Sequence, residues 1–380
     1  MRTNHLFLAG VLSIGLLASC AGNERNEPNT QKGTSETLTI SLAGIGTKAT
    51  DITTDPASGN AESTVNSAVI AITDGTAGNI KSIHNATISG NTATATISSI
   101  NTGDSVLVAV NVPSAFSYTG VTTSDEFHKL TTDIDNALGS DGTTVGTAET
   151  GKNLPMYGST GTFTNSGTGY TASVNVYHLA SKITLSSLAV NFDATGSFSS
   201  ASFTPTEVFL YNVPDHVQYS YQSSWYTTTT YYQGESTNNT NIKAYLGTGI
   251  FSPALATLKG TAGTAEIFDG SNGTNLFFYT IPNNNTSNDT RLIIKGTFSA
   301  DGKGDDNATV YYPVSINHIY GNSAPYGNDK CIYPNHNYCL TVLIKGRGNV
   351  NVNDPVDPTS LSATLTVQSF NAVNQSNTFN

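Results

Sequence analysis

The chain of 380 residues is acidic and poor in charge: 11% of its residues are charged, 16 are Lys or Arg, and the formal net charge is −11. Because contacts to phosphate need clustered Lys and Arg, this composition argues against a nucleic-acid partner. The length exceeds that of one ordinary domain and favours two.

The first twenty residues have the pattern of a secretory signal peptide. Arg2 precedes an apolar run over 6–17, and Leu17-Ala18-Ser19-Cys20 follows. The run is about a dozen residues long, whereas a helix that spans a bilayer needs about 20. The Leu-Ala-Ser-Cys ending resembles a bacterial lipobox, which implies a lipid on Cys20 and export to the outer membrane. The alternative is an ordinary signal peptide with a coincidental Cys. We assign 21–48 to a tether and a removable first strand.

Most of the segments that follow alternate apolar and polar residues with a period of two, as half-buried β-strands do. Examples are 37–42, 93–97, 106–112, 172–176, 291–296 and 340–344. Clusters of Gly, Asn, Asp and Ser separate them, which predicts an all-β fold of two tandem antiparallel β-sandwiches. We place these domains at 49–172 and 173–380, shortly after the polar stretch Gly161 to Gly169. Asp125 to Leu138 suggests a short helix.

Two of the alternating segments lie near opposite ends of the chain and are chemically interchangeable. Each has apolar side chains on one face, hydroxyl residues on the other, and a full row of backbone donors and acceptors. The apolar residues are Leu38, Ile40 and Leu42 in the first segment, and Leu361, Ala363, Leu365 and Val367 in the last. The last segment is therefore a candidate donor that can replace the first. The alternative is that both are ordinary strands of one molecule.

Lys48 is the candidate cleavage site between the first segment and the rest of the chain. It is the lone basic residue among the small residues of 44–50, a kind of segment that trypsin-like proteases reach. Cleavage between Lys48 and Ala49 would free the first strand and open a groove. A strand from another subunit could then enter it, as in donor-strand complementation. The simpler interpretation of Lys48 is a solvated loop lysine.

Two further pairs of residues are candidate sites. Cys331 and Cys339 could form a disulfide, which export permits, although their spacing does not establish that they are close. Trp225 and Tyr226 lie in a tyrosine-rich stretch and could stack on a sugar. They support an alternative function, a monomeric glycan-binding or adhesive surface lipoprotein with a host glycan or protein as its partner.

We expect no catalytic residues, no cofactor and no metal. The sequence contains no Gly-x-Ser-x-Gly nucleophile motif and no His-Glu-x-x-His zinc motif. The segment 146–153 resembles a phosphate-binding loop but has Asn153 where that loop needs Ser or Thr. The acidic segment 301–307 lacks the spacing and the distal Glu of a calcium loop, so we expect a polar hairpin turn there.

Several passages together resemble the Bacteroidales-type fimbrillins, the major-fimbrial-subunit family of type V pili, and they occur in order along essentially the whole chain. They are 61–70, 108–113, Leu154-Pro155-Met156-Tyr157-Gly158, 176–183, 333–342 and the closing Leu365-Thr366-Val367-Gln368-Ser369-Phe370.

This resemblance implies a two-domain transthyretin-like β-sandwich, export as a lipoprotein, removal of the first strand by proteolysis, and polymerisation into a fimbrium by strand exchange. The C-terminal strands are the implied donor, and the partners are other copies of the chain and other fimbrial subunits. The implied cleavage falls between Lys48 and Ala49. Better-known members have Arg there, which puts the identity of the protease in doubt. The candidate cleavage site favours a stalk subunit over an anchor and leaves a tip role open.

Overall fold

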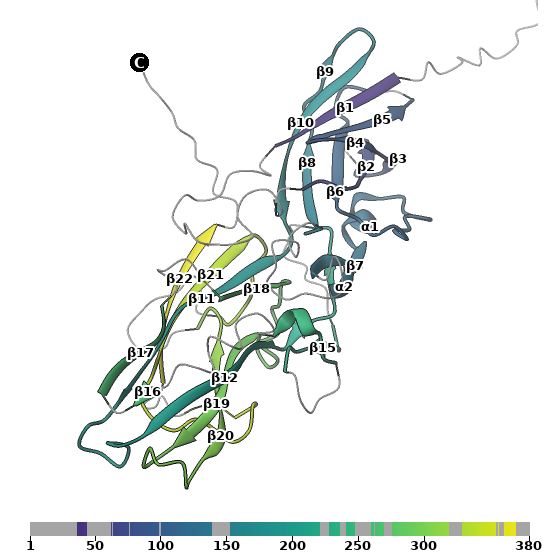
Figure 1. The fold of residues 1–380 in the computed structure, drawn as a ribbon. Helices are drawn as coiled ribbons and strands as arrows, with labels where there is room; N and C mark the ends of the chain where they lie inside the picture. Colours follow the sequence, from purple (N-terminus) through teal and green to yellow (C-terminus); the bar gives the residue numbers. More distant parts are fainter. Residues whose placement is uncertain are drawn as a thin grey trace, which may run out of the picture. The chain divides into compact units, whose positions relative to one another are not determined.

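The computed structural model describes residues 36–43, 62, 64–75, 77–98, 100–138, 153–220, 228–235, 241–247, 260–261, 263–269, 276–318, 329–354, 356 and 361–369. Over these residues the fold is all-β, with 22 strands and a few short helical turns (Figure 1). The predicted fold class is therefore confirmed, while the tandem transthyretin-like sandwiches stay a prediction. No helix in the described ranges has the length and apolar composition to cross a membrane.

The N-terminal half forms a nine-stranded sheet in the order β3-β2-β6-β8-β10-β1-β5-β4, with β9 paired to β10. All of its pairs are antiparallel except β1 with β10. The strands are β1 (Glu36–Ala43), β2 (Ala68–Thr73), β3 (Ile80–Asn85), β4 (Thr87–Ser89), β5 (Thr92–Ile97), β6 (Ser105–Val110), β8 (Met156–Thr160), β9 (Thr164–Asn165) and β10 (Gly169–His178).

The C-terminal half contains a five-stranded sheet, β17-β11-β21-β22 with β18 paired to β11, and a four-stranded sheet, β16-β12-β19-β20. β11 runs parallel to β21, and the other pairs are antiparallel. The strands are β11 (Ser181–Phe192), β12 (Ser202–Tyr211), β16 (Gly260–Thr261), β17 (Gly263–Asp269), β18 (Leu276–Thr280), β19 (Arg291–Ser299), β20 (Ala308–Ser315), β21 (His336–Ile344) and β22 (Leu361–Ser369).

Short elements complete the described fold. β14 (His216–Gln218) pairs with β7 (Thr131–Asp133), and β13 (Val213–Pro214) pairs with β15 (Tyr231–Tyr232). The helical turns are α1 (Ser124–His128), α2 (Ile134–Leu138) and the 3-10 turn η1 (Ala244–Leu246). The region predicted as one helix, 125–138, is thus two helical turns with a strand between them. α1 begins with a capping box, in which Thr123 Oγ1 accepts from the Glu126 amide and the Glu126 carboxylate accepts from the Thr123 amide.

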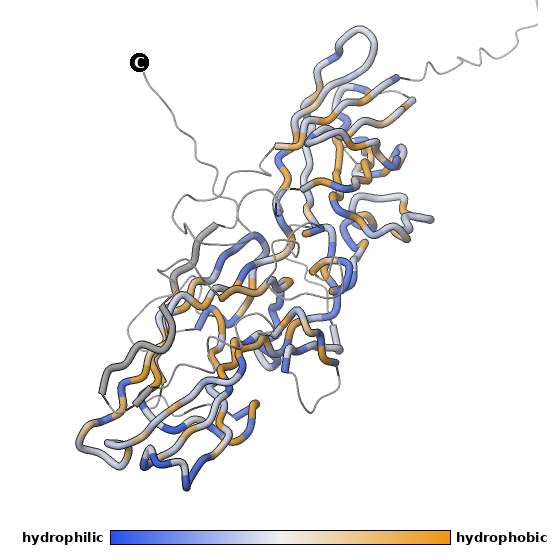
Figure 2. The backbone as a smooth tube through the Cα atoms, in the orientation of Figure 1, coloured by the Kyte–Doolittle hydropathy of each residue, from blue (hydrophilic) through white to orange (hydrophobic). Residues whose placement is uncertain are grey.

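Two hydrophobic clusters organise the strands. Along the backbone, apolar residues recur within the strands, and hydrophilic residues gather at several of the turns (Figure 2). The smaller cluster is built from one face of the nine-stranded sheet and includes Leu38, Ile40 and Leu42. The larger cluster contains residues from β2 and β6, from α1 and α2, and from the C-terminal sheets. β2 and β6 are almost continuously apolar because they contribute to both clusters.

Sheet membership changes between β10 and β11, so the predicted boundary near residue 172 falls inside β10. The stretch Gly161 to Gly169, read from sequence as a junction, contains β9 and its turn into β10. A buried contact crosses the change of sheet: the Tyr219 hydroxyl donates to the Asn111 carbonyl oxygen at 3.0 Å. The two halves therefore share contacts as well as one cluster.

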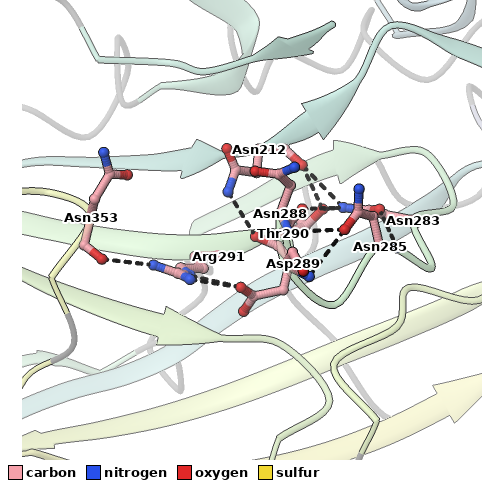
Figure 3. Close-up of polar contacts among 9 residues, drawn as sticks. Asn212, Asn283, Asn285, Asn288, Asp289, Thr290, Arg291 and Asn353 are labelled. Carbon is pink, nitrogen blue, oxygen red and sulfur yellow. Dashed lines mark hydrogen bonds and ion pairs between the residues drawn. The ribbon is translucent and has the colours of Figure 1, made fainter. Parts of the chain in front are cut away.

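An asparagine with positive φ, Asn111, follows β6, and another, Asn212, follows β12; Val-Pro comes directly after each. Figure 3 shows the second of these corners, where the Asn212 carbonyl oxygen accepts from the Thr290 hydroxyl at 2.9 Å. Asn283 Nδ2 also donates to Thr290 Oγ1, at 3.0 Å. Arg291 Nη2 lies 2.7 Å from Asp289 Oδ1. These hydrogen bonds join the turn after β12 to the residues just before β19, so the network supports the fold at this corner.

Candidate functional site

The first strand, β1, is held between two neighbours. It pairs antiparallel with β5, with Leu38 opposite Ala95, and parallel with β10, with Leu38 opposite Tyr170. The amide of Leu42 also donates to the Asn91 carbonyl oxygen at 2.9 Å. Removal of β1 would therefore leave two facing strand edges, β5 and β10, with unsatisfied backbone groups.

The apolar side chains of β1 fill the smaller cluster. Leu38 and Ile40 are fully buried and Leu42 is 3% exposed, whereas Thr37 and Ser41 are exposed. Burial of three such residues contributes about 5–9 kcal/mol. Ile40 has a small neighbour on each side, Ala93 of β5 and Ala172 of β10, whereas Leu38 lies between Ala95 and Tyr170 and Leu42 lies beside Val174. The slot is therefore widest around Ile40, where it admits a bulky apolar side chain.

Gly169 allows β10 to approach β1 closely. It is buried and lies directly opposite Thr37, and a side chain at this position would collide with the backbone of β1. Sequence reasoning missed this residue, because Gly169 ends a polar stretch that reads as an ordinary turn. A Gly immediately before an alternating segment was the available signal.

The candidate donor strand, β22, is an edge strand in this structure. It follows β21 at the end of its sheet, with Leu361 opposite Ile344 and Leu365 opposite Leu340. Leu361 is 3% exposed, Ala363 is 6% exposed, and Leu365 is half-buried against the larger cluster. The side chain of Val367 lies outside the described residues. Within the described part of the chain, β22 pairs with one strand and β1 with two, so fewer backbone hydrogen bonds hold β22 in place.

Several predicted sites lie outside the described residues, namely Cys20, Lys48, Ala49, Trp225 and Tyr226. Among the residues that the structure describes, no group of three or more His, Cys, Asp or Glu could hold a metal ion. The acidic segment 301–307 connects β19 to β20. Its Asp306 carboxylate accepts from the Ser299 hydroxyl at 2.6 Å and from the Ala300 amide at 2.7 Å, as in the predicted polar turn.

The sequence left open whether Cys331 and Cys339 form a disulfide. In the structure both are thiols and are not joined to each other. Cys339 is in β21, opposite Thr184 of β11 and Thr366 of β22. Cys331 Sγ lies 3.6 Å from the Asp329 carbonyl oxygen. Burial and the Asp329 carboxylate raise the pKa of Cys331 to about 11.

An ion pair between a buried lysine and a partly buried glutamate ties the segment upstream of β2 to β11. Glu62 pairs with Lys182 of β11, and the Tyr279 hydroxyl of β18 donates to Glu62 Oε1 at 2.6 Å. Lys182 Nζ also lies 4.8 Å from the centre of the Phe277 ring. Sequence reasoning missed this cluster because its members are far apart along the chain.

No protein-family model and no curated protein matches the chain. Its fold is similar to that of a fimbrilin from Porphyromonas gingivalis, with a TM-score of 0.58 and 17% identity over 89% of this chain and 98% of the other. A protein of proposed cell-adhesion function from Bacteroides eggerthii gives a TM-score of 0.56 and 19% identity, over 89% and 97% of the two chains. Another from Parabacteroides distasonis gives 0.57 and 16%, over 90% and 99%. The resemblance to Bacteroidales fimbrillins is therefore confirmed at the level of the fold.

Proposed function

We propose that the protein is a structural subunit of a cell-surface fimbria, which joins other subunits by strand exchange, supports adhesion and has no catalytic activity. The observation that carries this proposal is the setting of β1. It is paired on both sides and its three apolar side chains are buried. The segment 44–61, with the candidate cleavage site, separates it in sequence from β2.

The proposed sequence of events begins with export and lipidation at Cys20, which anchors the precursor at the outer membrane. While β1 occupies its slot, the edges of β5 and β10 are covered and cannot pair with another molecule. Cleavage between Lys48 and Ala49 then frees β1. The slot accepts the Leu361–Ser369 strand of another copy, whose apolar residues also alternate.

The pairing of the two strands explains why exchange is favourable. In its own subunit β22 makes a ladder with β21, whereas in the slot it would lie between two strands. Each additional backbone hydrogen bond contributes a net ~0.5–1.5 kcal/mol. The exchange therefore increases pairing once β1 has left.

The comparisons support the same role. The similar solved structures include a fimbrilin and proteins of proposed cell-adhesion function, and each is covered almost completely. A fimbrial subunit lies at the cell surface and assembles with other subunits. Cleavage and polymerisation of this chain would indicate a stalk subunit, and their absence would indicate a tip or anchor subunit.

The test is brief trypsin treatment of the precursor from Ala21 onward, followed by N-terminal sequencing and electron microscopy. We expect a new N-terminus at Ala49 and the appearance of ladders or filaments. The Lys48→Gln variant should stay uncut and monomeric. Lys303→Gln is the matched control, because Lys303 is an exposed lysine in the β19–β20 turn, and it should assemble like the wild type.

Stable monomers after a clean cut at Lys48 would contradict strand exchange. They would favour the alternative function, an adhesive lipoprotein that acts as a monomer. Filaments from Lys48→Gln would instead refute the cleavage step.

A further inference from the structure

A polar pocket lies at the free edges of the nine-stranded sheet. Its volume is about 420 Å³, near the small end of the range of about 300–1,000 Å³ for ligand sites. β3 and β4 are the two ends of the strand order, and residues of both line the pocket together with β5. The principal polar lining residues are His84, Asn85, Thr87, Thr94, Thr96 and Tyr118.

The chemistry of the lining excludes charged ligands. None of its residues is Asp, Glu, Lys or Arg, so it offers no cation for an acidic group and no carboxylate for a metal or an amine. Its hydroxyl and amide groups can both donate and accept hydrogen bonds, as the hydroxyls of a sugar do. The aromatic ring of Tyr118 adds an apolar surface of the kind that packs against the C–H face of a sugar ring.

His84 lines the pocket and contributes an imidazole ring. Its Nε2 atom is buried and has no hydrogen-bond partner among the residues that the structure describes. Burial lowers the pKa of His84, which keeps the imidazole neutral near pH 7, with one nitrogen donating and the other accepting.

A row of threonines extends from the pocket across the sheet. Thr87 of β4 is opposite Thr94 of β5, Thr94 is opposite Thr39 of β1, and Thr39 is opposite Thr171 of β10. All four lie on the face away from the smaller cluster, to which their strands contribute Ile40, Ala93 and Ala172. Neighbouring strands are ~4.8 Å apart, so the row spans about 14 Å. The four strands appear side by side in Figure 1.

From these observations we propose that the pocket binds a neutral sugar residue and that the threonine row contacts the next residues of the same saccharide. The ligand is a neutral glycan chain, held at one end in the pocket. None of the lining residues belongs to β1, but the pocket shares Ala95 with the wall of the slot, and the row includes Thr39 of β1. The complete site therefore belongs to the precursor, in which β1 is in place.

The test is saturation-transfer NMR on the full precursor with three probes: methyl β-D-galactopyranoside, maltotriose and N-acetylneuraminic acid. Concentrations of about 10 mM detect dissociation constants in the millimolar range. We expect binding of the two neutral probes, with the trisaccharide tighter, and no binding of the acidic sugar. Failure of both neutral probes to bind would overturn the proposal. Equal affinity for the two would overturn the role of the threonine row.

Three matched variants localise the site. Thr94→Val keeps the shape and removes a hydroxyl from the pocket and row, so both neutral probes should bind about five- to tenfold more weakly. Thr171→Val should weaken the trisaccharide alone. Thr309→Val, on the exposed face of β20, is the control and should change neither. Thermal melts verify that each variant is folded, and unchanged binding in a folded Thr94→Val protein would overturn the site.

Discussion

A methyl group on the Cα of Gly169 would lie 2.3 Å from the carbonyl oxygen of Thr37, so the parallel pairing of β10 with β1 requires a glycine at this position. The proposed assembly has to break this pairing, together with the pairing of β1 and β5. A substitution at Gly169 can therefore weaken the pairing of β1 without changing any residue of β1.

Gly169→Ala should weaken the seating of β1 by about 1–3 kcal/mol, because the backbone must shift to admit the methyl group. Hydrogen exchange of the amides in 37–43 measures this directly, and we expect faster exchange there than in β11. Gly161→Ala is the control, since its added carbon would lie 3.3 Å from the Ser105 hydroxyl and 3.8 Å from the Asp104 carbonyl oxygen. Equal exchange in the two variants would contradict the importance of the close approach.

Ile40→Ala should destabilise the uncut precursor by about 2–5 kcal/mol, because it leaves a cavity in the smaller cluster. Thr39→Ala, on the opposite face of the same strand, should change stability by less than about 1 kcal/mol. Denaturant unfolding before and after trypsin separates the two states. If β1 leaves on cleavage, the cleaved forms of both variants should have the stability of the cleaved wild type, and a persistent difference would refute that step.

Leu365→Asp should block polymerisation and leave the monomer folded. A charge would have to enter the apolar slot in the acceptor subunit, whereas in its own subunit Leu365 is only half-buried. Thr364→Asp adds the same charge at the exposed neighbouring position and should still assemble. Electron microscopy after trypsin gives the result, and filaments from Leu365→Asp would exclude β22 as the donor.

Glu62→Gln should cost about 3–5 kcal/mol, because it leaves the buried Lys182 ammonium without its carboxylate. Asp135→Asn is the contrasting variant. Asp135 also pairs with a lysine, Lys243, but its side chain is 58% exposed, and the loss there should be about 0–1 kcal/mol. Thermal or denaturant unfolding compares the two, and similar losses would show that the Glu62 pair is no stronger than a surface pair.

Alkylation of Cys331 by iodoacetamide should be slow at pH 8 and accelerate until the pH approaches 11, because the reactive thiolate is disfavoured by burial and by Asp329. At pH 8 we expect a rate roughly a hundredfold below that of an ordinary thiol. Asp329→Asn removes the nearby negative charge, so it lowers the pKa and should speed the reaction. Mass spectrometry of the Cys331 peptide measures the rate, with N-acetylcysteine as the reference.

Strands were predictable where one face is solvated, because period-two alternation then survives in the sequence, as in β1, β10 and β21. The capping box of α1 was equally local, with Thr123 and Glu126 three residues apart. The parallel partnership of β1 with β10 was not predictable, since it joins residues more than a hundred positions apart. The first sheet also extends past residue 172. Residues that resemble a linker in sequence form β9 and the start of β10, which pair as a hairpin.

The apolar face of β1 was predictable from the sequence, but the walls of its slot were not. Alternation identified Leu38, Ile40 and Leu42 as one face of a strand, and the structure buries all three. The small walls of the slot, Ala93 and Ala172, had no recognisable role until the register placed them beside Ile40. The saccharide pocket was missed for a related reason, because it needs the two ends of the sheet to meet.

The slot that β1 vacates and the donor strand β22 are different parts of the subunit, and this determines how a fibre can grow. Because the proposed contact joins unlike surfaces, β1's place on one copy and β22 on the next, it is a head-to-tail contact that does not close on itself as a twofold dimer does. A fibre built in this way has a direction. One terminus carries an empty slot and the other an unused strand, so capping either terminus would stop elongation from that side alone.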